Sequence, residues 1–256
     1  MSEYVRVSEA EGVMEIRLHR PERKNALTHE MYSAMTAALS AAEQTPSIRV
    51  VLIGGTDDCF TAGNDMVDFL NNPPQGDDAP VMRFLRKLTE MEKPLVAAVN
   101  GPAVGVGTTL LLHCDLVYVA RGARLQMPFV NLGLCPEAAS SFLLPLIMGH
   151  QRAAELLMLG ETIDGDKAVQ VGIANAVFDD AEYWQQAQAK ARQLARQPAA
   201  SVRLTKQLLK SSINEQMKAH MKCEGDLFIQ RLASPEAREA MQAFMEKRKP
   251  DFSQFD

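Results

Sequence analysis

Lys93-Pro94-Leu95-Val96-Ala97-Ala98-Val99-Asn100-Gly101-Pro102-Ala103-Val104-Gly105-Val106-Gly107 combines an apolar run with a glycine-rich turn. We expect Leu95–Val99 to form a buried strand and a helix to begin at Gly105–Gly107. A dinucleotide-binding turn would need a third glycine at Leu110, so a dinucleotide fold is disfavoured. The turn still presents backbone N–H groups at a helix start, where they can point at an anion.

Strand and helix patterns alternate around this stretch. Val13–Leu18 alternates apolar and polar residues, which is typical of a half-buried strand, and Arg49–Ile53 is the next expected strand. Thr28 is placed to cap a helix that runs through Gln44. A further strand is expected around Leu116–Val119. The short links between these elements indicate an α/β fold with crossover connections.

The second half of the chain changes character. Three prolines make Asn71–Pro80 a loop. Strand signals stop beyond Ala181, and we divide the chain into a core over residues 1–195 and a helical region over residues 196–256. Helices are expected over Val81–Met91, Ala181–Gln197, Ala199–Lys210 and Ile213–Leu232, and from Ser234 onward. The apolar face of the penultimate helix fits either the same core or another subunit; its members are Met217, Met221 and Phe228.

Composition excludes several classes of protein. The 256 residues, 46% hydrophobic and 23% charged, are those of an ordinary globular protein. A net charge of -5 argues against nucleic acid as a partner, and no apolar run reaches the roughly 20 residues that span a bilayer. Residues 1–6 do not resemble a secretory signal and residues 251–256 do not form a peroxisomal address, so the expected location is cytoplasmic.

Common catalytic motifs are missing from the sequence. It has no phosphate loop of the Gly-x-x-x-x-Gly-Lys-Ser/Thr type, no Gly-x-Ser-x-Gly elbow and no His-Glu-x-x-His helix. The five histidines are scattered, and the four cysteines, which contain no Cys-x-x-Cys pair, are interpreted as reduced thiols. We therefore predict no metal site.

Two segments together are more specific than either alone. Phe60-Thr61-Ala62-Gly63-Asn64-Asp65-Met66 and the Lys93–Gly107 stretch, about 40 residues apart, resemble the crotonase (enoyl-CoA hydratase/isomerase) family. Arg20–Leu27, Cys114–Ala120 and Phe244–Arg248 extend this resemblance over nearly the whole chain. The resemblance implies a spiral of repeated strand-strand-helix (ββα) units followed by helices that build homotrimers or homohexamers. It also implies an acyl-CoA substrate, with coenzyme A as part of that substrate and no separate cofactor.

In this family two backbone N–H groups hold the thioester carbonyl, and they correspond by position to Asn64 and Val106. Deprotonation next to a thioester puts negative charge on the carbonyl oxygen, and one fixed donor there contributes roughly 3 kcal/mol to transition-state stabilisation. Ala62, Gly63 and Gly105 are small enough for a ligand to approach the backbone.

The acidic residues distinguish between reactions. The two glutamates of the family's hydratases correspond to Thr109 and Phe129, and neither residue transfers protons at neutral pH. Glu137 resembles the single glutamate of the Δ3,Δ2-enoyl-CoA isomerases, and Ala62–Met66 resembles the same branch. One carboxylate can remove a proton from C2 of a 3-enoyl thioester and return it to C4, and burial would raise its pKa toward neutrality. Alternatively, Glu137 is a first-turn helix residue stabilised by the helix dipole.

The resemblance also implies contacts to substrate or coenzyme A at Lys24, Ala26, Leu27, Ala62, Gly63, Asn64, Asp65, Met66, Gly105, Phe244 and Lys247. Several of these residues have plain structural alternatives. Asp65 is placed to cap a short helix over Met66–Leu70, and Lys24 fits a solvated loop. Phe244 and Lys247 equally fit an amphipathic terminal helix. Asn71–Pro80 either borders the acyl pocket or is a spacer.

Three hypotheses about function follow. The leading one is an isomerase that moves a double bond from C3 to C2 of an unsaturated acyl-CoA, with Glu137 as the single acid and base. A second is another crotonase-type lyase, such as a hydratase that uses Glu137 alone. The third is a catalytically silent acyl-CoA-binding subunit, which the residues at Thr109 and Phe129 motivate.

Overall fold

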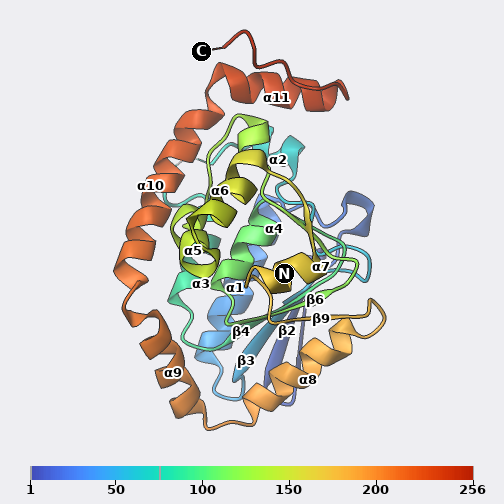
Figure 1. The fold of residues 1–256 in the computed structure, drawn as a ribbon. Coiled ribbons are helices and arrows are strands. Elements are labelled where there is room, and N and C mark those ends of the chain that lie inside the picture. Colours follow the sequence, from blue (N-terminus) through green and yellow to red (C-terminus); the bar gives the residue numbers. More distant parts are fainter. Residues whose placement is uncertain (1, 75, 256) are drawn as a thin grey trace.

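The computed structural model describes residues 2–74 and 76–255. Gln75, within the loop expected over Asn71–Pro80, lies outside the described residues, as do Met1 and Asp256. The chain forms a central sheet with helices on both faces and a long arm of helices along one side (Figure 1).

The larger sheet has six strands, of which the first pair is antiparallel and every later pair is parallel. In spatial order the strands are β1 (Val5–Ala10), β2 (Val13–Leu18), β3 (Val50–Gly54), β4 (Leu95–Val99), β6 (Leu116–Ala120) and β9 (Ala176–Phe178). The predicted strands over Val13–Leu18 and Leu95–Val99 are confirmed, whereas the strand predicted over Arg49–Ile53 lies one residue later.

A smaller sheet is built from β5 (Pro102–Val104), β7 (Arg124–Gln126) and β8 (Ile163–Asp164). The chain passes from β4 to β5 and again from β6 to β7, so each of these turns adds one strand to each sheet. A further bridge joins Thr61 to Ala103. This repetition is the strand-strand-helix spiral that the motifs imply.

The helices that precede the arm lie around the two sheets, and some of them cover each face of the larger sheet. They are α1 (His29–Gln44), α2 (Met66–Asn71), α3 (Pro80–Glu90), α4 (Val106–Thr109), α5 (Ser140–Met148), α6 (His150–Leu159), α7 (Gly165–Gln170) and α8 (Tyr183–Ala195), with short 3-10 turns η1 (Pro21–Arg23), η2 (Leu110–His113) and η3 (Val130–Leu132). Pro80 was predicted in the loop but is the first residue of α3, because proline at this position lacks only an N–H that the helix would not use. Thr28 caps α1 as predicted, since its hydroxyl accepts from the Met31 amide.

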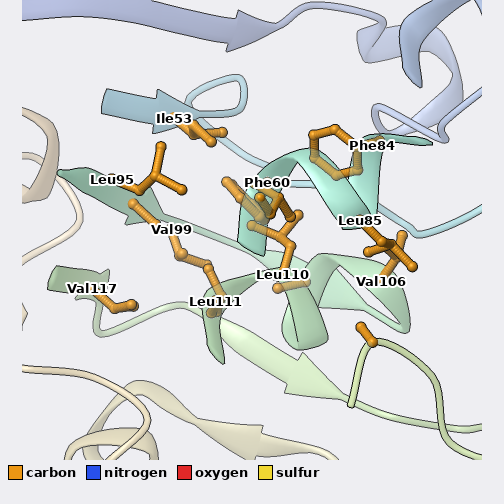
Figure 2. Packing of buried hydrophobic residues seen from close by; sticks show 14 of the residues in the cluster. Ile53, Phe60, Phe84, Leu85, Leu95, Val99, Val106, Leu110, Leu111 and Val117 are labelled. Atoms are coloured by element: carbon orange, nitrogen blue, oxygen red, sulfur yellow. The ribbon is translucent and has the colours of Figure 1, made fainter. Parts of the chain in front are cut away.

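The alternation of side chains along β4 divides the core. Leu95, Ala97 and Val99 belong to the larger apolar cluster beneath α1 and α3, whereas Val96 and Ala98 pack toward α8. Figure 2 shows Val99 next to Leu111, and Leu95, Leu110 and the α3 residues Phe84 and Leu85 in the same cluster. The turn between β5 and η2 is therefore anchored in packed core on either side.

The arm consists of α9 (Ala199–Ser211), α10 (Asn214–Leu232) and α11 (Pro235–Met245), which run along one side and over one end of the core (Figure 1). Lys206 of α9 is buried and donates to the Lys93 carbonyl (2.8 Å) and to Asp115 (2.7 Å), which fixes the arm near the start of β4. Met217, Met221 and Phe228 belong to the larger core cluster, so this face of α10 packs on its own chain. The division at residues 195 and 196 stays a prediction.

In the part of the chain that the structure describes, no helix is long and apolar enough to cross a bilayer.

Candidate active site

The Ala62–Met66 segment is held on two sides by backbone hydrogen bonds. The Ala62 amide donates to the Lys24 carbonyl (2.9 Å), the Leu27 amide donates to the Gly63 carbonyl (2.8 Å), and the Asp65 amide donates to the Leu27 carbonyl (2.9 Å). These bonds bring Lys24–Leu27 beside the segment. The amides before and after Asn64 are engaged, whereas the Asn64 amide donates to no acceptor within residues 2–74 and 76–255.

The Gly105–Val106 turn presents a second such amide. Gly105 has φ +57°, and its amide donates to the Gln126 carbonyl (2.8 Å). Val106 is the first residue of α4, and among the described residues its N–H has no acceptor, as expected at a helix start.

The two turns are pressed together. The Thr61 amide donates to the Pro102 carbonyl (2.9 Å), and the Val104 amide donates to the Thr61 carbonyl (3.0 Å). Gly63 has φ +88°, and a Cβ atom there would lie 2.8 Å from the Val104 carbonyl oxygen. Close backbone contact thus fixes the spacing of the Asn64 and Val106 amides, and only glycine fits at position 63.

Both turns line one apolar cavity of about 210 Å³. Asn64 and Glu137 line this cavity and also a smaller one of about 20 Å³, which extends the apolar surface toward α3 and α10. The larger cavity is lined by Ala62, Gly63, Asn64, Met66, Phe69, Val104, Gly105, Val106, Pro128, Phe129, Leu132, Leu134, Glu137, Phe228, Met241 and Phe244. Glu137 is the one carboxyl group in either wall among the described residues, beside two open N–H donors.

The Glu137 side chain is 7% exposed, and its Oε1 atom has no hydrogen-bond partner within the described residues. Burial, reinforced by the nearby charge of Glu224, raises the pKa of this carboxyl group from 4.5 to about 8. A group with that pKa takes up and releases protons near neutral pH, which is what general acid–base catalysis requires.

A strained turn carries Glu137. Ala138 and Ala139 both have positive φ (59° and 57°), a conformation that costs a non-glycine residue on the order of 1–2 kcal/mol. The buried His113 ring donates from Nε2 to the Ala138 carbonyl (2.8 Å), and burial lowers the pKa of His113 to about 4, so the ring is neutral. Strain kept by such contacts near a cavity is typical of functional sites. Glu137 precedes α5 but lies outside its first turn, which disfavours the helix-dipole alternative.

Tyr32 of α1 adds a buried polar group to the site. Its hydroxyl donates to Asn64 Oδ1 (2.5 Å), and burial, together with the charge of Glu137, raises its pKa well above 10. With Oδ1 engaged by Tyr32, the Asn64 side chain has its Nδ2 donor left to offer, and Asn64 lines the cavity together with Glu137. The Tyr32–Asn64 contact therefore orients a further donor beside Glu137.

We expect Tyr32→Phe to lower kcat/KM about 3- to 10-fold, because it removes one hydrogen bond worth about 1 kcal/mol and releases the Asn64 side chain. Tyr183→Phe is the matched control, since the Tyr183 hydroxyl is buried and has no hydrogen-bond partner in the described residues. Steady-state kinetics of both variants measure the difference. Equal effects of the two substitutions would contradict the orienting role.

The structure places the other predicted contact residues as follows. Ala62, Gly63, Asn64, Met66, Gly105 and Phe244 line the cavity, whereas Leu27 is buried beneath it and Lys24, Ala26, Asp65 and Lys247 lie outside its wall. Asp65 caps α2 by accepting from the amides of Val67 (3.0 Å) and Asp68 (3.1 Å), and it pairs with Arg20 (2.7 Å). Its carboxylate is occupied by contacts that maintain the fold, as the capping alternative predicts.

The two positions that match hydratase glutamates are filled differently. Phe129 is part of the apolar wall and packs edge-on against Phe228, with 6.3 Å between ring centroids. Thr109 is fully buried and its hydroxyl finds no partner among the described residues. Neither supplies a carboxylate, and no group of three or more metal-ligating side chains occurs in the described ranges.

Sequence reasoning missed Tyr32 and Glu224. Tyr32 lies on the apolar face of α1. From the sequence alone it looks like any other core residue of that helix, because the partner of its hydroxyl is known only from the fold. Glu224 did leave a signal: with Met217, Met221 and Phe228 it shares the buried face of α10 at helical spacing, and a carboxylate on such a face calls for a partner.

Comparison with known proteins identifies the family of the chain. A family model described as enoyl-CoA hydratase/isomerase matches residues 8–255. The 1,2-epoxyphenylacetyl-CoA isomerase of Escherichia coli K12 is 37% identical, with 99% of each chain covered. The human enoyl-CoA delta isomerase 2 is 32% identical over 94% of this chain and 63% of the human protein. The solved structure of OdaA from Pseudomonas aeruginosa is 52% identical and superposes with a TM-score of 0.93 over 95% of this chain and 99% of OdaA.

These matches extend over both glycine turns and the Glu137 loop as well as the arm, so they cover the complete site and not the spiral alone. The fold predicted from the motifs is confirmed. Two open amides beside a buried carboxyl group, together with similarity along nearly the entire length, show that the chain belongs to the enoyl-CoA hydratase/isomerase family.

Proposed function

We propose that this protein is an isomerase that moves a carbon–carbon double bond from C3 to C2 of unsaturated acyl-CoA thioesters. The observation that carries the proposal is the position of Glu137, which alone among the described carboxyl groups lines the cavity beside the Asn64 and Val106 amides. The human relative, named as an enoyl-CoA delta isomerase, supports it, whereas the Escherichia coli relative is named as an isomerase of a different coenzyme-A thioester.

The chemistry needs one proton carrier and one oxyanion site. The Glu137 carboxylate removes a proton from C2 of the 3-enoyl thioester, and the electron pair moves into a dienolate whose negative charge rests on the thioester oxygen. The Asn64 and Val106 amides stabilise that oxygen, since their N–H groups are fixed before the reaction begins. Glu137 then returns the same proton to C4, the double bond settles between C2 and C3, and atoms and charge balance without another reactant.

The cavity wall fits this reaction. Phe69, Phe129 and Phe228 line the same cavity as Glu137, and their aromatic rings exclude water and favour an apolar acyl chain. Exclusion of water also opposes hydration, which requires a positioned water molecule and, in the family's hydratases, two carboxylates.

A direct assay tests the proposal. Purified protein is given a 3-enoyl-CoA, and formation of the conjugated 2-enoyl thioester is followed by ultraviolet absorbance. Loss of absorbance from a supplied 2-enoyl-CoA would instead identify a hydratase that uses Glu137 alone. Binding of acyl-CoA by calorimetry, with no thioester consumed, would identify a silent binding subunit.

The pH dependence follows from the Glu137 pKa. Only the carboxylate removes the C2 proton, so kcat/KM should fall about tenfold per pH unit below a pKa near 8 and level off above it. A pH–rate profile of kcat/KM between pH 5 and about 10 measures this limb. A profile that stays flat down to pH 5 would contradict the assignment of Glu137 as base.

Three further features complete the proposal. Coenzyme A enters as part of the substrate, with no added cofactor. Lys24, Ala26, Leu27, Phe244 and Lys247 are proposed to contact its adenine and phosphate end. We also propose a homotrimer or homohexamer in the cytoplasm, supported by exposed apolar residues along the arm, Leu204, Leu208, Leu209 and Leu227.

A further inference from the structure

A second buried carboxyl group lies behind the first. Glu224 of α10 is 6% exposed and is absent from the walls of both cavities. Its Oε1 atom accepts from the Ser141 amide (2.9 Å) and from the Ser141 hydroxyl, whereas its Oε2 atom has no partner within the described residues. One oxygen of this carboxyl group is therefore hydrogen-bonded and the other is buried without a hydrogen bond. Burying a polar atom in this way lowers the stability of the fold, so its presence calls for an explanation.

The bonded half of Glu224 holds the beginning of α5. Ser141 is the second residue of that helix, and the Ser140 amide donates to the Glu137 carbonyl (3.0 Å). Ala138 and Ala139, with positive φ, lie between these two points. A contact that pins Ser141 to α10 thus fixes the far end of the strained turn, while His113 fixes its middle through the Ala138 carbonyl.

Glu224 also acts on Glu137 by its charge. Burial raises the pKa of Glu224, and the charge of Glu224 contributes to the raised pKa of Glu137. The other titratable or charged groups facing this pair come from α1, η2, the Glu137 loop and α10; they are Tyr32, His113, Cys135, His220 and Arg231. Tyr32 and His113 are neutral at pH 7, so any negative charge that opposes ionisation of Glu137 comes from Glu224.

We propose that Glu224 is a positioning residue for proton transfer by Glu137: it holds the first turn of α5 against α10 and thereby fixes the turn from which Glu137 enters the cavity. The inference rests on the proposed function. It assigns a residue of the arm to the reaction although that residue does not touch the cavity. It also gives a physical role to a carboxyl group on the buried face of α10.

Two variants separate its two effects. Glu224→Gln keeps a carbonyl oxygen for Ser141 but removes the charge, so the acid limb of kcat/KM should move to lower pH while KM stays nearly unchanged. For each pH unit by which the limb moves, kcat/KM of the variant rises about tenfold relative to the parent, at pH values below the Glu137 pKa of both proteins. Glu224→Ala should move the limb equally and also lower the plateau kcat about tenfold or more, because the hold on Ser141 is lost.

Glu215→Gln is the matched control, since Glu215 lies on the same helix with its side chain exposed. Circular dichroism and thermal unfolding check that each variant folds. If Glu224→Ala does not fold, Ser141→Ala, which removes the hydroxyl that donates to Glu224, tests the same hold through a lower plateau kcat. A plateau kcat equal to that of the parent in the variant that loses the hold on Ser141 would overturn the inference. Glu137→Gln separates the two proposals: if it abolishes turnover while the Glu224 variants behave as the parent, only the role of Glu224 fails, whereas full activity of Glu137→Gln would remove the proposed function itself.

Discussion

Glu137→Gln should lower kcat about a thousandfold, within the range of roughly 10²- to 10⁴-fold that a single acid–base group contributes, and should leave KM nearly unchanged. Glutamine has the same shape but cannot carry the proton from C2 to C4. The Asn64 and Val106 amides and the aromatic wall remain, so acyl-CoA should still bind. The measurement is steady-state turnover of a 3-enoyl-CoA with both proteins.

Glu90→Gln is a suitable control, because Glu90 ends α3 on the exposed surface. Stability gives a second check. The Glu137 pKa of about 8 lies above its ordinary 4.5, so the folded state binds more protons and the free energy of unfolding falls as pH rises between these values. Glutamine removes this fall, and loss of activity through unfolding is therefore not expected. Turnover within tenfold of the parent would rule out Glu137 as the proton carrier.

Gly63→Ala should lower kcat/KM about 10²- to 10³-fold, the effect of losing one oxyanion donor. The added methyl group would lie 2.8 Å from the Val104 carbonyl oxygen, and the backbone there has φ +88°. The two turns must separate to admit it, which moves the Asn64 amide away from the Val106 amide. Binding of a stable acyl-CoA by calorimetry, alongside turnover, distinguishes loss of transition-state stabilisation from loss of the pocket.

Gly149→Ala isolates the contribution of backbone strain. Gly149 has φ +82°, and a Cβ atom there would meet nothing within 4 Å. Its substitution carries a similar conformational cost without any contact between turns. Similar losses of kcat/KM in the two variants would show that strain, and not the spacing of the amides, limits activity.

Local patterns predicted the parts of the fold that depend on neighbours in sequence. The continuous apolar run Leu95–Val99 predicted a strand, and the structure shows that strand buried on both faces. Thr28 and Ser234 cap the helices that follow them. Glu137 was found through its motif. The pairing of Tyr32 with Asn64 and of Ser141 with Glu224 could not be predicted, because each joins elements far apart in the chain and its geometry depends on the packed core.

Phe129 illustrates the limit of motif reasoning. The sequence indicated only that a carboxylate was missing there, whereas the structure shows a ring packed against Phe228, which comes from α10. Phe129 therefore removes a carboxylate that hydration would need and at the same time forms part of the apolar cavity wall that the proposed isomerisation would use. That meaning becomes visible only once the arm is in place.

The arm also determines the order in which the molecule loses its function. Phe228, Met241 and Phe244 close the cavity, yet α10 and α11 lie at one side and one end of the core (Figure 1). Peripheral helices open at lower free energy than a sheet buried on both faces. Mild heat or denaturant should therefore detach the arm first. Turnover should then be lost at a lower temperature or denaturant concentration than the secondary structure of the six-stranded sheet.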